Sequence, residues 1–262
     1  MGLGKALCEE LARRGSVVIV ADIDGDAAEQ VTSIVQTEAK ARAVRIDVSQ
    51  KEEVARLIET TVSEFGRLDY IFNNAAIYIG GDARDVSIEQ WDRVLNVNLH
   101  GVVYGTINAY QVMAKQGYGH IVNVSSASGL IPQPCNASYS TCKHAIIGLS
   151  LTMRCEGADL SVRVSTACPG DMKTSVYENM VVMNMPREQV AEVSRRSHYM
   201  MPQWSAEHAA REILLGVSRN KAMIIFPAAV RWIWRLYRAF PSLIYWVSRR
   251  RMRMVRKLRI SA

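Results

Sequence analysis

Short apolar runs alternate with amphipathic stretches along most of the chain. The runs are rich in Val, Ile and Ala, and they lie at 17–21, 43–46, 70–73, 120–124 and 162–167. Runs of this length are typical of strands buried within a parallel sheet. Apolar residues spaced three or four apart predict helices over 5–14, 26–38, 51–65, 88–114 and 139–156. The alternation predicts an α/β fold with a doubly wound, parallel, Rossmann-type sheet.

The start of the chain departs from this pattern. A Rossmann sheet begins with a strand that feeds a glycine-rich turn, whereas this chain opens on the turn itself, at residues 1–4, and continues into a helix. That strand is central in a doubly wound sheet, so its loss exposes backbone groups and apolar faces on its neighbours. We therefore expect the first strand to be missing, through a truncation or a misassigned start.

Length and composition fit one domain with an extension. A chain of 262 residues can bury about three quarters of its unfolded surface. With 49% hydrophobic and 22% charged residues, neither disorder nor a multi-span membrane protein is indicated. Five cysteines without ligand spacing argue against a metal site and favour a reducing compartment. We expect a catalytic domain over 1–225, an extension over 226–262 and a cytoplasmic location.

A candidate nucleotide site lies at the start of the chain. Gly2 and Gly4 at a helix start would let the backbone approach a pyrophosphate, which a helix N-terminus favours. The strand expected at 17–21 ends on Asp22, whose carboxylate can accept both ribose hydroxyls and repels a 2′-phosphate. This favours NAD over NADP. The alternative is that Asp22 and Asp24 only form a turn that caps the next helix.

A second carboxylate follows the next strand. Asp47 could bond the adenine amino group of a dinucleotide. Alternatively Asp47 or Ser49 is the N-cap of the helix that begins at Lys51, and both roles can hold together.

Tyr139 and Lys143 are the candidates for acid–base chemistry. They lie four residues apart in a predicted helix, so their side chains share one face. A free phenol titrates near about 10, so proton transfer near neutrality needs a nearby positive charge. Ser126 follows the strand at 120–124, at the carboxyl edge where open α/β sheets bind ligands, and could hold a substrate oxygen. Read singly, these are ordinary helix and loop residues.

Asparagines mark two further positions. Asn73 and Asn74 end the strand at 70–73, and the small residues Ala75 and Ala76 after them leave room for a flat ring. Asn98 lies in an otherwise apolar helical stretch, where an amide is unfavourable unless it is hydrogen-bonded. A paired core asparagine is the alternative at this position.

Together these motifs resemble the short-chain dehydrogenase/reductase family, over residues 1 to about 225. The matching segments are Gly2-Leu3-Gly4 for the end of TGxxxGxG, Asn73 to Ala76 for NNAG, Asn98 for the helix asparagine, Ser126 for the strand-end serine, Tyr139 to Lys143 for YxxxK and Pro169 to Thr174 for PGxxxT. Ala76 replaces a glycine, and the first glycine of the turn is absent together with its threonine. The second departure puts cofactor affinity in question.

The resemblance implies a role for each catalytic candidate. Tyr139 would exchange a proton with the substrate oxygen, and Ser126 would orient that oxygen. Lys143 would bond the ribose and lower the pKa of Tyr139, while Asn98 would hold a water in a proton relay.

The resemblance also implies the cofactor and the assembly. NAD, with NADP less favoured, would bind along Gly2, Leu3, Gly4, Asp22, Ile23, Asp47, Val48, Asn74, Ala75, Tyr139, Lys143, Pro169, Gly170, Met172 and Thr174. Members commonly pair through long helices, here 88–114 and 139–156, so a homodimer or homotetramer is expected.

The segment after Thr174 is expected to cover the substrate. It is enriched in flexible or aromatic side chains, at Met180, Val181, Val182, Met183, Met185, Tyr199, Met200, Met201 and Trp204. Such side chains suit an apolar ligand, which favours a lipophilic alcohol or ketone. Core or oligomer contacts are the alternative.

The C-terminal extension carries the positive charge of the chain. Residues 219–262 contain twelve Lys or Arg and no Asp or Glu, so a net charge of +7 overall leaves 7 − 12 = −5 for residues 1–218. No apolar stretch approaches the roughly 20 residues that span a bilayer. Interleaved Trp, Tyr and Arg favour a helix lying on an anionic membrane surface. The alternatives are packing on the protein or a second subunit, and nucleic acid, which is not expected without a reader module.

The sequence thus predicts an oxidoreductase that transfers hydride between NAD(H) and a secondary alcohol or ketone. The alternative is a non-catalytic dinucleotide-binding scaffold or sensor, recruited to a membrane by its basic tail. The presence of Ser126, Tyr139, Lys143 and Asn98 together favours catalysis, because a scaffold needs none of them.

Overall fold

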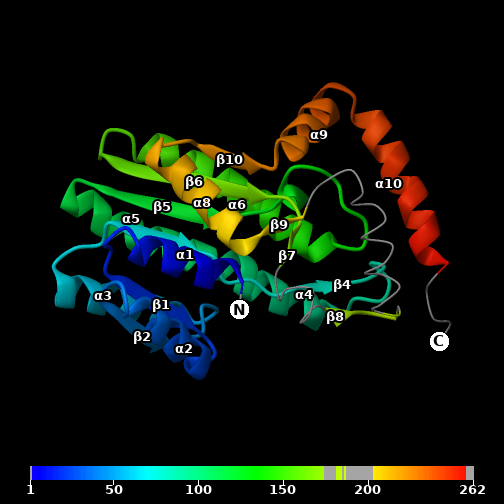
Figure 1. The fold of residues 1–262 in the computed structure, drawn as a ribbon. Coiled ribbons are helices and arrows are strands. Elements are labelled where there is room, and N and C mark those ends of the chain that lie inside the picture. Colours follow the sequence, from blue (N-terminus) through cyan, green and yellow to red (C-terminus); the bar gives the residue numbers. More distant parts are fainter. Residues whose placement is uncertain (1, 174–180, 185, 187–202, 258–262) are drawn as a thin grey trace.

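A four-stranded parallel sheet forms the centre of the molecule. The computed structural model describes residues 2–173, 181–184, 186 and 203–257. In spatial order the strands are β10 (Met223–Phe226), β6 (Val162–Pro169), β5 (Gly119–Val124) and β3 (Tyr70–Asn73). Every neighbouring pair is parallel, so the carboxyl ends of all four strands meet at one edge (Figure 1). The predicted α/β fold with a parallel sheet is confirmed.

Helices cover both faces of this sheet. Leu3 and Leu7 of α1 (Leu3–Ala12) pack with Ile213 of α8 (Ala206–Ser218) on one face. The other face is covered by α5 (Gly101–Gln116), α6 (Ala137–Glu156) and α3 (Lys51–Phe65). Two further strands, β1 (Val18–Asp22) and β2 (Ala41–Arg45), pair in parallel and pack on α2 (Gly25–Val35).

Among the residues that the structure describes, no backbone hydrogen bonds between strands join the two sheets. Within the described part of the chain, β1 pairs only with β2 and β3 pairs only with β5, and no strand lies between β1 and β3. Helix α1 lies beside this division (Figure 1). Its Leu11 packs against the apolar clusters of both sheets, so side chains connect the two parts where strands do not.

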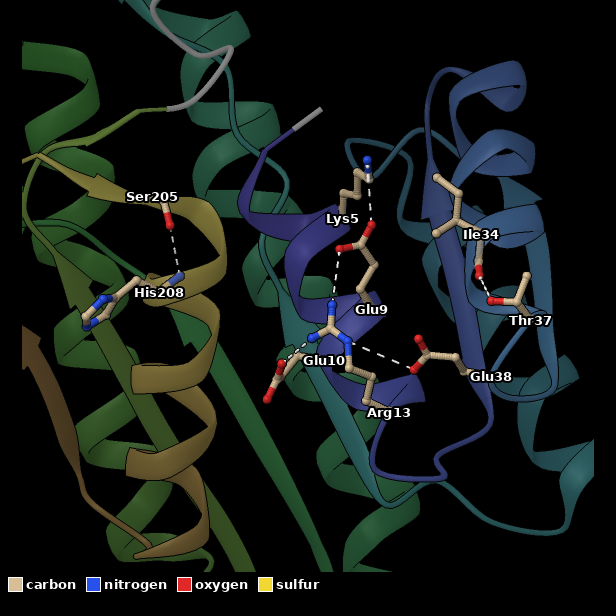
Figure 2. A network of polar contacts seen from close by, with 9 residues as sticks. All are labelled: Lys5, Glu9, Glu10, Arg13, Ile34, Thr37, Glu38, Ser205 and His208. Atoms are coloured by element: carbon tan, nitrogen blue, oxygen red, sulfur yellow. Dashed lines mark hydrogen bonds and ion pairs between the residues drawn. The ribbon is translucent and has the colours of Figure 1, made fainter.

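The outer face of α1 carries a network of charges (Figure 2). Lys5 pairs with Glu9, and Arg13 pairs with Glu9, with Glu10 and, at 4.0 Å, with Glu38 after α2. Exposed pairs of this kind are each worth about 0–1 kcal/mol, so they add little to the apolar packing beneath.

Elements outside the sheet complete the carboxyl edge. Helix α4 (Ile88–Leu95) continues through a π-helical turn, η1 (Asn96–His100), into α5, so the helix predicted over 88–114 is interrupted at Asn98. A 3-10 turn, η2 (Ala127–Gly129), follows β5. Two small parallel pairings lie outside the main sheets: β4 (Ile79–Gly80) pairs with β8 (Val181–Val182), and β7 (Met172–Lys173) pairs with β9 (Trp204–Ser205).

Two helices end the described chain. Helix α9 (Ala228–Ala239) follows β10 directly, and α10 (Pro241–Arg256) follows α9 at the side where the sheet strands end (Figure 1). None of the helices that the structure describes is long and apolar enough to cross a membrane.

The capping alternatives are resolved at two helices. Asp24 is the N-cap of α2, where its carboxylate accepts a hydrogen bond from the Ala27 amide. The expectation that Asp47 or Ser49 caps α3 is wrong, because the N-cap is Gln50 and Asp47 instead accepts from the Ser49 amide.

Candidate active site

The candidate catalytic residues meet at the carboxyl edge of the sheet. Ser126 lies just beyond the end of β5, and Tyr139 and Lys143 lie in the first two turns of α6. A hydrogen bond links the Ser126 hydroxyl to the phenol of Tyr139. The Lys143 Nζ lies 5.3 Å from the centroid of the Tyr139 ring. The structure therefore brings together the three side chains on which the sequence argument depends.

Tyr139 is held as a neutral phenol. Burial raises its pKa to about 12, and the hydrogen bond from Ser126 opposes this rise. A phenol with so high a pKa stays protonated at neutral pH, and it can give up its proton only where a nearby cation stabilises the phenolate.

Lys143 supplies such a cation from a buried position. Only 2% of the residue is exposed, and its Nζ donates to the Val124 carbonyl at 2.8 Å. Burial lowers the pKa of Lys143 to about 8, which keeps the ammonium largely charged at neutral pH. The backbone of Lys143 is also fixed, because its carbonyl accepts from the Ser125 hydroxyl at 2.7 Å.

Asn98 makes two hydrogen bonds to one residue. Its Oδ1 accepts from the Ile77 amide and its Nδ2 donates to the Ile77 carbonyl, both at 2.8 Å. Asn98 is fully buried in the π-helical turn, a feature that is frequent at functional sites. The pairing fixes the backbone immediately before Tyr78.

Tyr78 was not singled out by the sequence analysis. Its ring lies 5.4 Å from the ring of Tyr139, centroid to centroid, and its hydroxyl donates to Asn136 Oδ1. Burial, reinforced by Cys135 and Tyr139, holds the pKa of Tyr78 well above its ordinary value. No local spacing signalled this residue, because the contact joins the loop after β3 to the start of α6.

A buried amide network holds the strands and helices of the site together. The Asn123 Oδ1 accepts from Asn73 at 2.7 Å and from Thr106 at 3.1 Å, while its Nδ2 donates to Ser150 at 3.0 Å. These residues come from β5, β3, α5 and α6. Satisfied buried networks of this kind specify one arrangement of the elements.

The predicted nucleotide residues lie along the same edge. Helix α1 begins at Leu3, with no acidic residue in its first turn and no side-chain cap on Gly2, so its amide end suits an anion. A Cβ at Gly4 would lie 2.9 Å from the Asn74 side-chain nitrogen, so a larger residue there would require the Asn74 side chain to move. Ala75 is exposed at the surface. These residues fit a dinucleotide pyrophosphate and a flat ring.

The adenosine end of this site has two opposing charges. Asp22 is exposed at the end of β1, and its Oδ1 accepts from the Asp24 amide at 3.1 Å. The neighbouring Ile23 is also exposed, and its carbonyl accepts from Arg45 at 3.3 Å. Arg45 stands opposite Asp22 in the register of β1 and β2 and was missed by the sequence analysis.

The remaining predicted cofactor residues lie at the ends of other strands. Asp47 and Val48 follow β2 and are half-buried, and Val48 lies against Gly101. Pro169 ends β6, and the amide of Gly170 donates to the Phe226 carbonyl at 2.7 Å.

Part of the substrate cover lies outside the described residues. Met172 is half-buried within β7, and Thr174 is not described. Of the expected cover, Val181, Val182, Met183 and Trp204 are described, whereas Met180, Met185, Tyr199, Met200 and Met201 are not.

Comparison with known proteins agrees with this geometry. The model of the short chain dehydrogenase family matches residues 1–184. A 3-oxoacyl-[acyl-carrier-protein] reductase of Synechocystis sp. is 34% identical over 181 residues, covering 68% of this chain and 73% of the relative. A cyclohexanol dehydrogenase of Acinetobacter sp. is 36% identical over 176 residues, covering 66% and 70%.

A solved structure resembles the fold over nearly its whole length. A short chain dehydrogenase/reductase from Burkholderia phymatum in complex with NAD superposes with a TM-score of 0.83 at 25% identity, covering 92% of this chain and 91% of that one. The chain belongs to the short-chain dehydrogenase family. It is therefore an oxidoreductase of alcohols or ketones that uses a nicotinamide dinucleotide.

Proposed function

We propose that this chain interconverts a lipophilic secondary alcohol and its ketone, with NAD as the preferred dinucleotide and Tyr139 as the acid–base residue. The observation that supports this most is the grouping of Ser126, Tyr139 and the Lys143 ammonium at one point of the carboxyl edge. A dinucleotide-binding scaffold has no use for a buried cation beside a buried phenol.

Ser126 and Tyr139 handle the substrate oxygen in this proposal. In the oxidation, the Ser126 hydroxyl orients the alcohol, and the Tyr139 phenolate accepts its hydroxyl proton as the carbinol C–H bond breaks. When bound, the oxidised dinucleotide supplies the acceptor for that hydride and a further positive charge beside the phenol. In the reduction, the phenol, which its high pKa keeps protonated, donates the proton to the ketone oxygen, and the Lys143 ammonium stabilises the phenolate that forms.

Lys143 makes the proton transfer reversible near neutrality. A phenolate buried without a counter-charge is strongly disfavoured, and the ammonium 5.3 Å from the ring centroid offsets this. One Nζ hydrogen is held by Val124, so two remain for a ribose hydroxyl.

Asn98 acts as a positioning residue as well as a candidate for the proton relay. Both polar atoms of its amide already bind Ile77, so a relay water has one lone pair and one amide hydrogen left to use. Through Ile77 it fixes Tyr78 against the ring of Tyr139.

The preference for NAD rests on Asp22. Its exposed carboxylate stands where the ribose of adenosine would bind and repels a 2′-phosphate. Arg45, across the register, is the feature that would accept such a phosphate, but its Nε is engaged by the Ile23 carbonyl.

The lipophilic substrate is supported by the side chains around Tyr139. Tyr78 forms one wall, and the Cys135 thiol lies 3.5 Å from the Met252 sulfur of α10 nearby. Such surfaces favour apolar ligands. Among the relatives, the cyclohexanol dehydrogenase is named for a cyclic alcohol.

We also propose that the chain forms a homodimer or homotetramer. We propose that this assembly lies in the cytoplasm and associates with the surface of an anionic membrane. The exposed Ile88 and Ile107 on α4 and α5 support pairing through these helices. The five free cysteines suit a reducing compartment.

The test is Tyr139→Phe, which removes only the transferable proton. Turnover of NAD with a series of cyclic and straight-chain secondary alcohols should fall by about a hundredfold or more. Fluorescence titration should give unchanged NADH affinity, with NADPH binding more weakly to both proteins. Tyr118→Phe, at an exposed tyrosine, is the control and should keep full turnover. Unchanged turnover in Tyr139→Phe refutes the assignment of Tyr139. A wild type that binds NADH but turns over none of the alcohols refutes the enzymatic function and favours the dinucleotide-binding scaffold.

A further inference from the structure

The C-terminal helices are attached to the carboxyl edge by one face. Val230 of α9 is fully buried and packs with Leu130, Cys168 and Ile225. In α10, the Ser248 hydroxyl donates to the Pro132 carbonyl at 3.5 Å.

Charge and aromatic contacts hold the two helices in place. Arg256 binds the buried Asp82 at 2.9 Å, which fixes the end of α10 to the loop after β4. The hydroxyls of Tyr237 and Tyr245 lie 3.0 Å apart, and their rings pack edge to face. The α9–α10 pair is therefore a fixed surface rather than a trailing tail.

The opposite face of this pair exposes a concentration of apolar side chains. Of the eighteen large apolar residues exposed in the described chain, eight belong to it: Trp232, Leu236, Phe240, Leu243, Tyr245, Trp246, Val247 and Met254. Leu243, Trp246 and Val247 follow helical spacing, so they form one stripe on α10. Phe240, 62% exposed, continues the stripe at the corner between the helices.

The same face is strongly basic. Residues 228–257 contain nine Arg or Lys and no Asp or Glu. The guanidinium of Arg250 lies 4.6 Å from the ring centroid of Trp246, and that of Arg235 lies 5.1 Å from Trp232. Cation and ring thus reach the surface together, with the charge beside the apolar stripe.

We propose that this face, formed by the exposed side chains of residues 232–254 and named the docking face below, binds the surface of an anionic lipid bilayer. Trp, Tyr and Arg suit the headgroup layer, where rings and aliphatic side chains enter the acyl boundary and guanidinium groups meet lipid phosphate. Each basic residue near an anionic membrane contributes about 1 kcal/mol, equivalent to about fivefold in affinity.

Charge argues against the other occupants. A second copy of the chain would oppose the cations of this face to the same cations across a two-fold axis, and residues 228–257 offer no acidic partner on either side. An RNA would match the charge and could stack on the exposed rings, but Leu243 and Val247 offer it neither hydrogen bonds nor a stacking surface, so these side chains would stay exposed to water.

Docking would turn the candidate active site toward the lipid. Helix α9 starts where β10 ends, and α10 contacts Pro132 and Cys135, which precede α6 and Tyr139 (Figure 1). If the substrate is the lipophilic alcohol proposed above, the bilayer would supply it at the edge where it reacts; this consequence rests on the proposed function, whereas docking does not.

Vesicle flotation of the full chain tests the docking. Vesicles of phosphatidylserine and phosphatidylcholine in equal parts should carry the protein at low salt, and vesicles of phosphatidylcholine alone should not. The charge variant R249Q/R250Q/R253Q should lose about 100-fold in affinity. The apolar variant L243S/W246S/V247S should lose at least about tenfold.

Matched control variants distinguish binding through the docking face from nonspecific binding of exposed cations and apolar residues to vesicles. K40Q/K51Q/K115Q and I88S/I107S/L215S change exposed cations and exposed apolar residues elsewhere, and both should float like the wild type. Circular dichroism checks that each variant is folded. Failure of the wild type to float with anionic vesicles, or equal losses in the matched variants, overturns the proposal.

Two further measurements distinguish membrane docking from RNA binding and from the proposed enzymatic function. Binding of a labelled oligouridylate should be weaker than vesicle binding; an RNA that binds more tightly, with affinity unaffected by L243S/W246S/V247S, overturns the lipid assignment. Tyr139→Phe should float like the wild type although it is inactive. Normal flotation with a wild type that turns over no alcohol would therefore refute the proposed function alone.

Discussion

Lys143 shows what a single buried charge demands of this structure. The ammonium is shielded from solvent and donates a hydrogen bond to the Val124 carbonyl at 2.8 Å. Burial favours the neutral amine, which is why its pKa falls from 10.5 to about 8. At neutral pH, the buried charge of Lys143 therefore lowers the free energy of unfolding, while it places a cation beside Tyr139.

Replacing Lys143 by Met should make this cost measurable. Between pH 8 and 10.5 the unfolded wild type binds one more proton than the folded state, so its free energy of unfolding rises with pH. The rise amounts to about 3 kcal/mol, since one pKa unit is worth about 1.4 kcal/mol. It should be absent in Lys143→Met. Urea denaturation without dinucleotide, across this pH range, gives the difference between the two proteins.

The test rests on the difference in free energy of unfolding between the wild type and Lys143→Met at each pH, because other groups also titrate in this range. Burial raises the pKa of the Cys8 and Cys135 thiols to about 11, which lowers stability at high pH in both proteins. Lys40→Met, at an exposed cation, is the control and should parallel the wild type. A wild type and Lys143→Met that differ by a constant amount at every pH would contradict the assignment.

The proximity of the candidate catalytic residues could be predicted from sequence because their spacing is local. Tyr139 and Lys143 share a helix face, and Ser126 follows a recognisable strand, so their proximity follows from secondary structure and one sheet edge. Tyr78 and Arg45 could not be predicted in this way. Each acts through a contact between separate elements, which depends on how those elements pack.

At the scale of elements, α5 and β3 approach closely at one glycine. A Cβ at Gly105 would overlap the Asn73 side-chain oxygen. The amide of Asn73 cannot move freely, because it donates to Asn123 at 2.7 Å and to Thr106 at 3.3 Å. The buried network therefore sets how near the helix lies to the strand.

We predict that Gly105→Ala lowers the free energy of unfolding by about 1–3 kcal/mol, through overpacking. Gly148→Ala on α6 is the matched control, since a Cβ there meets nothing within 4 Å. It should be neutral or stabilise by up to about 1 kcal/mol, through helix propensity. Urea denaturation of both variants measures this, and equal stabilities would show that the contact is not tight.

Apolar periodicity predicted most of the regular elements. The strand over 70–73 agrees with β3 at both ends, and the helix over 51–65 agrees with α3. It did not predict the π-helical turn at Asn98, because periodicity read over a long helix does not resolve the geometry of a single turn. Nor did it predict β10 (Met223–Phe226), which was not among the apolar runs that the sequence analysis identified as strands.

At the scale of the molecule, the division between the two sheets sets the order of unfolding. Strand β5 is hydrogen-bonded on both sides, whereas β1 and β2 have only each other. A unit without ladder bonds to the rest can open without disrupting the larger sheet.

Hydrogen exchange should reveal this order. We predict that amides of β1, β2 and α2 exchange faster than those of β5 and β6, without added dinucleotide. NADH should slow exchange at β1 if Asp22 binds the ribose, and should leave the far end of α3 unchanged. Mass spectrometry of peptic peptides measures both. Equal protection of the two sheets would mean that α1 couples them into one cooperative unit.

The unpaired sides of β1 and β3 also bear on how the isolated chain behaves in solution. Main-chain amides and carbonyls attract any extended segment whatever its side chains, so such edges invite contacts between molecules. Repulsion between charged surfaces acts over a Debye length and weakens in salt, whereas this attraction does not. Aggregation of the purified chain would then begin at the exposed edges of β1 and β3 in the folded state, before any helix unfolds.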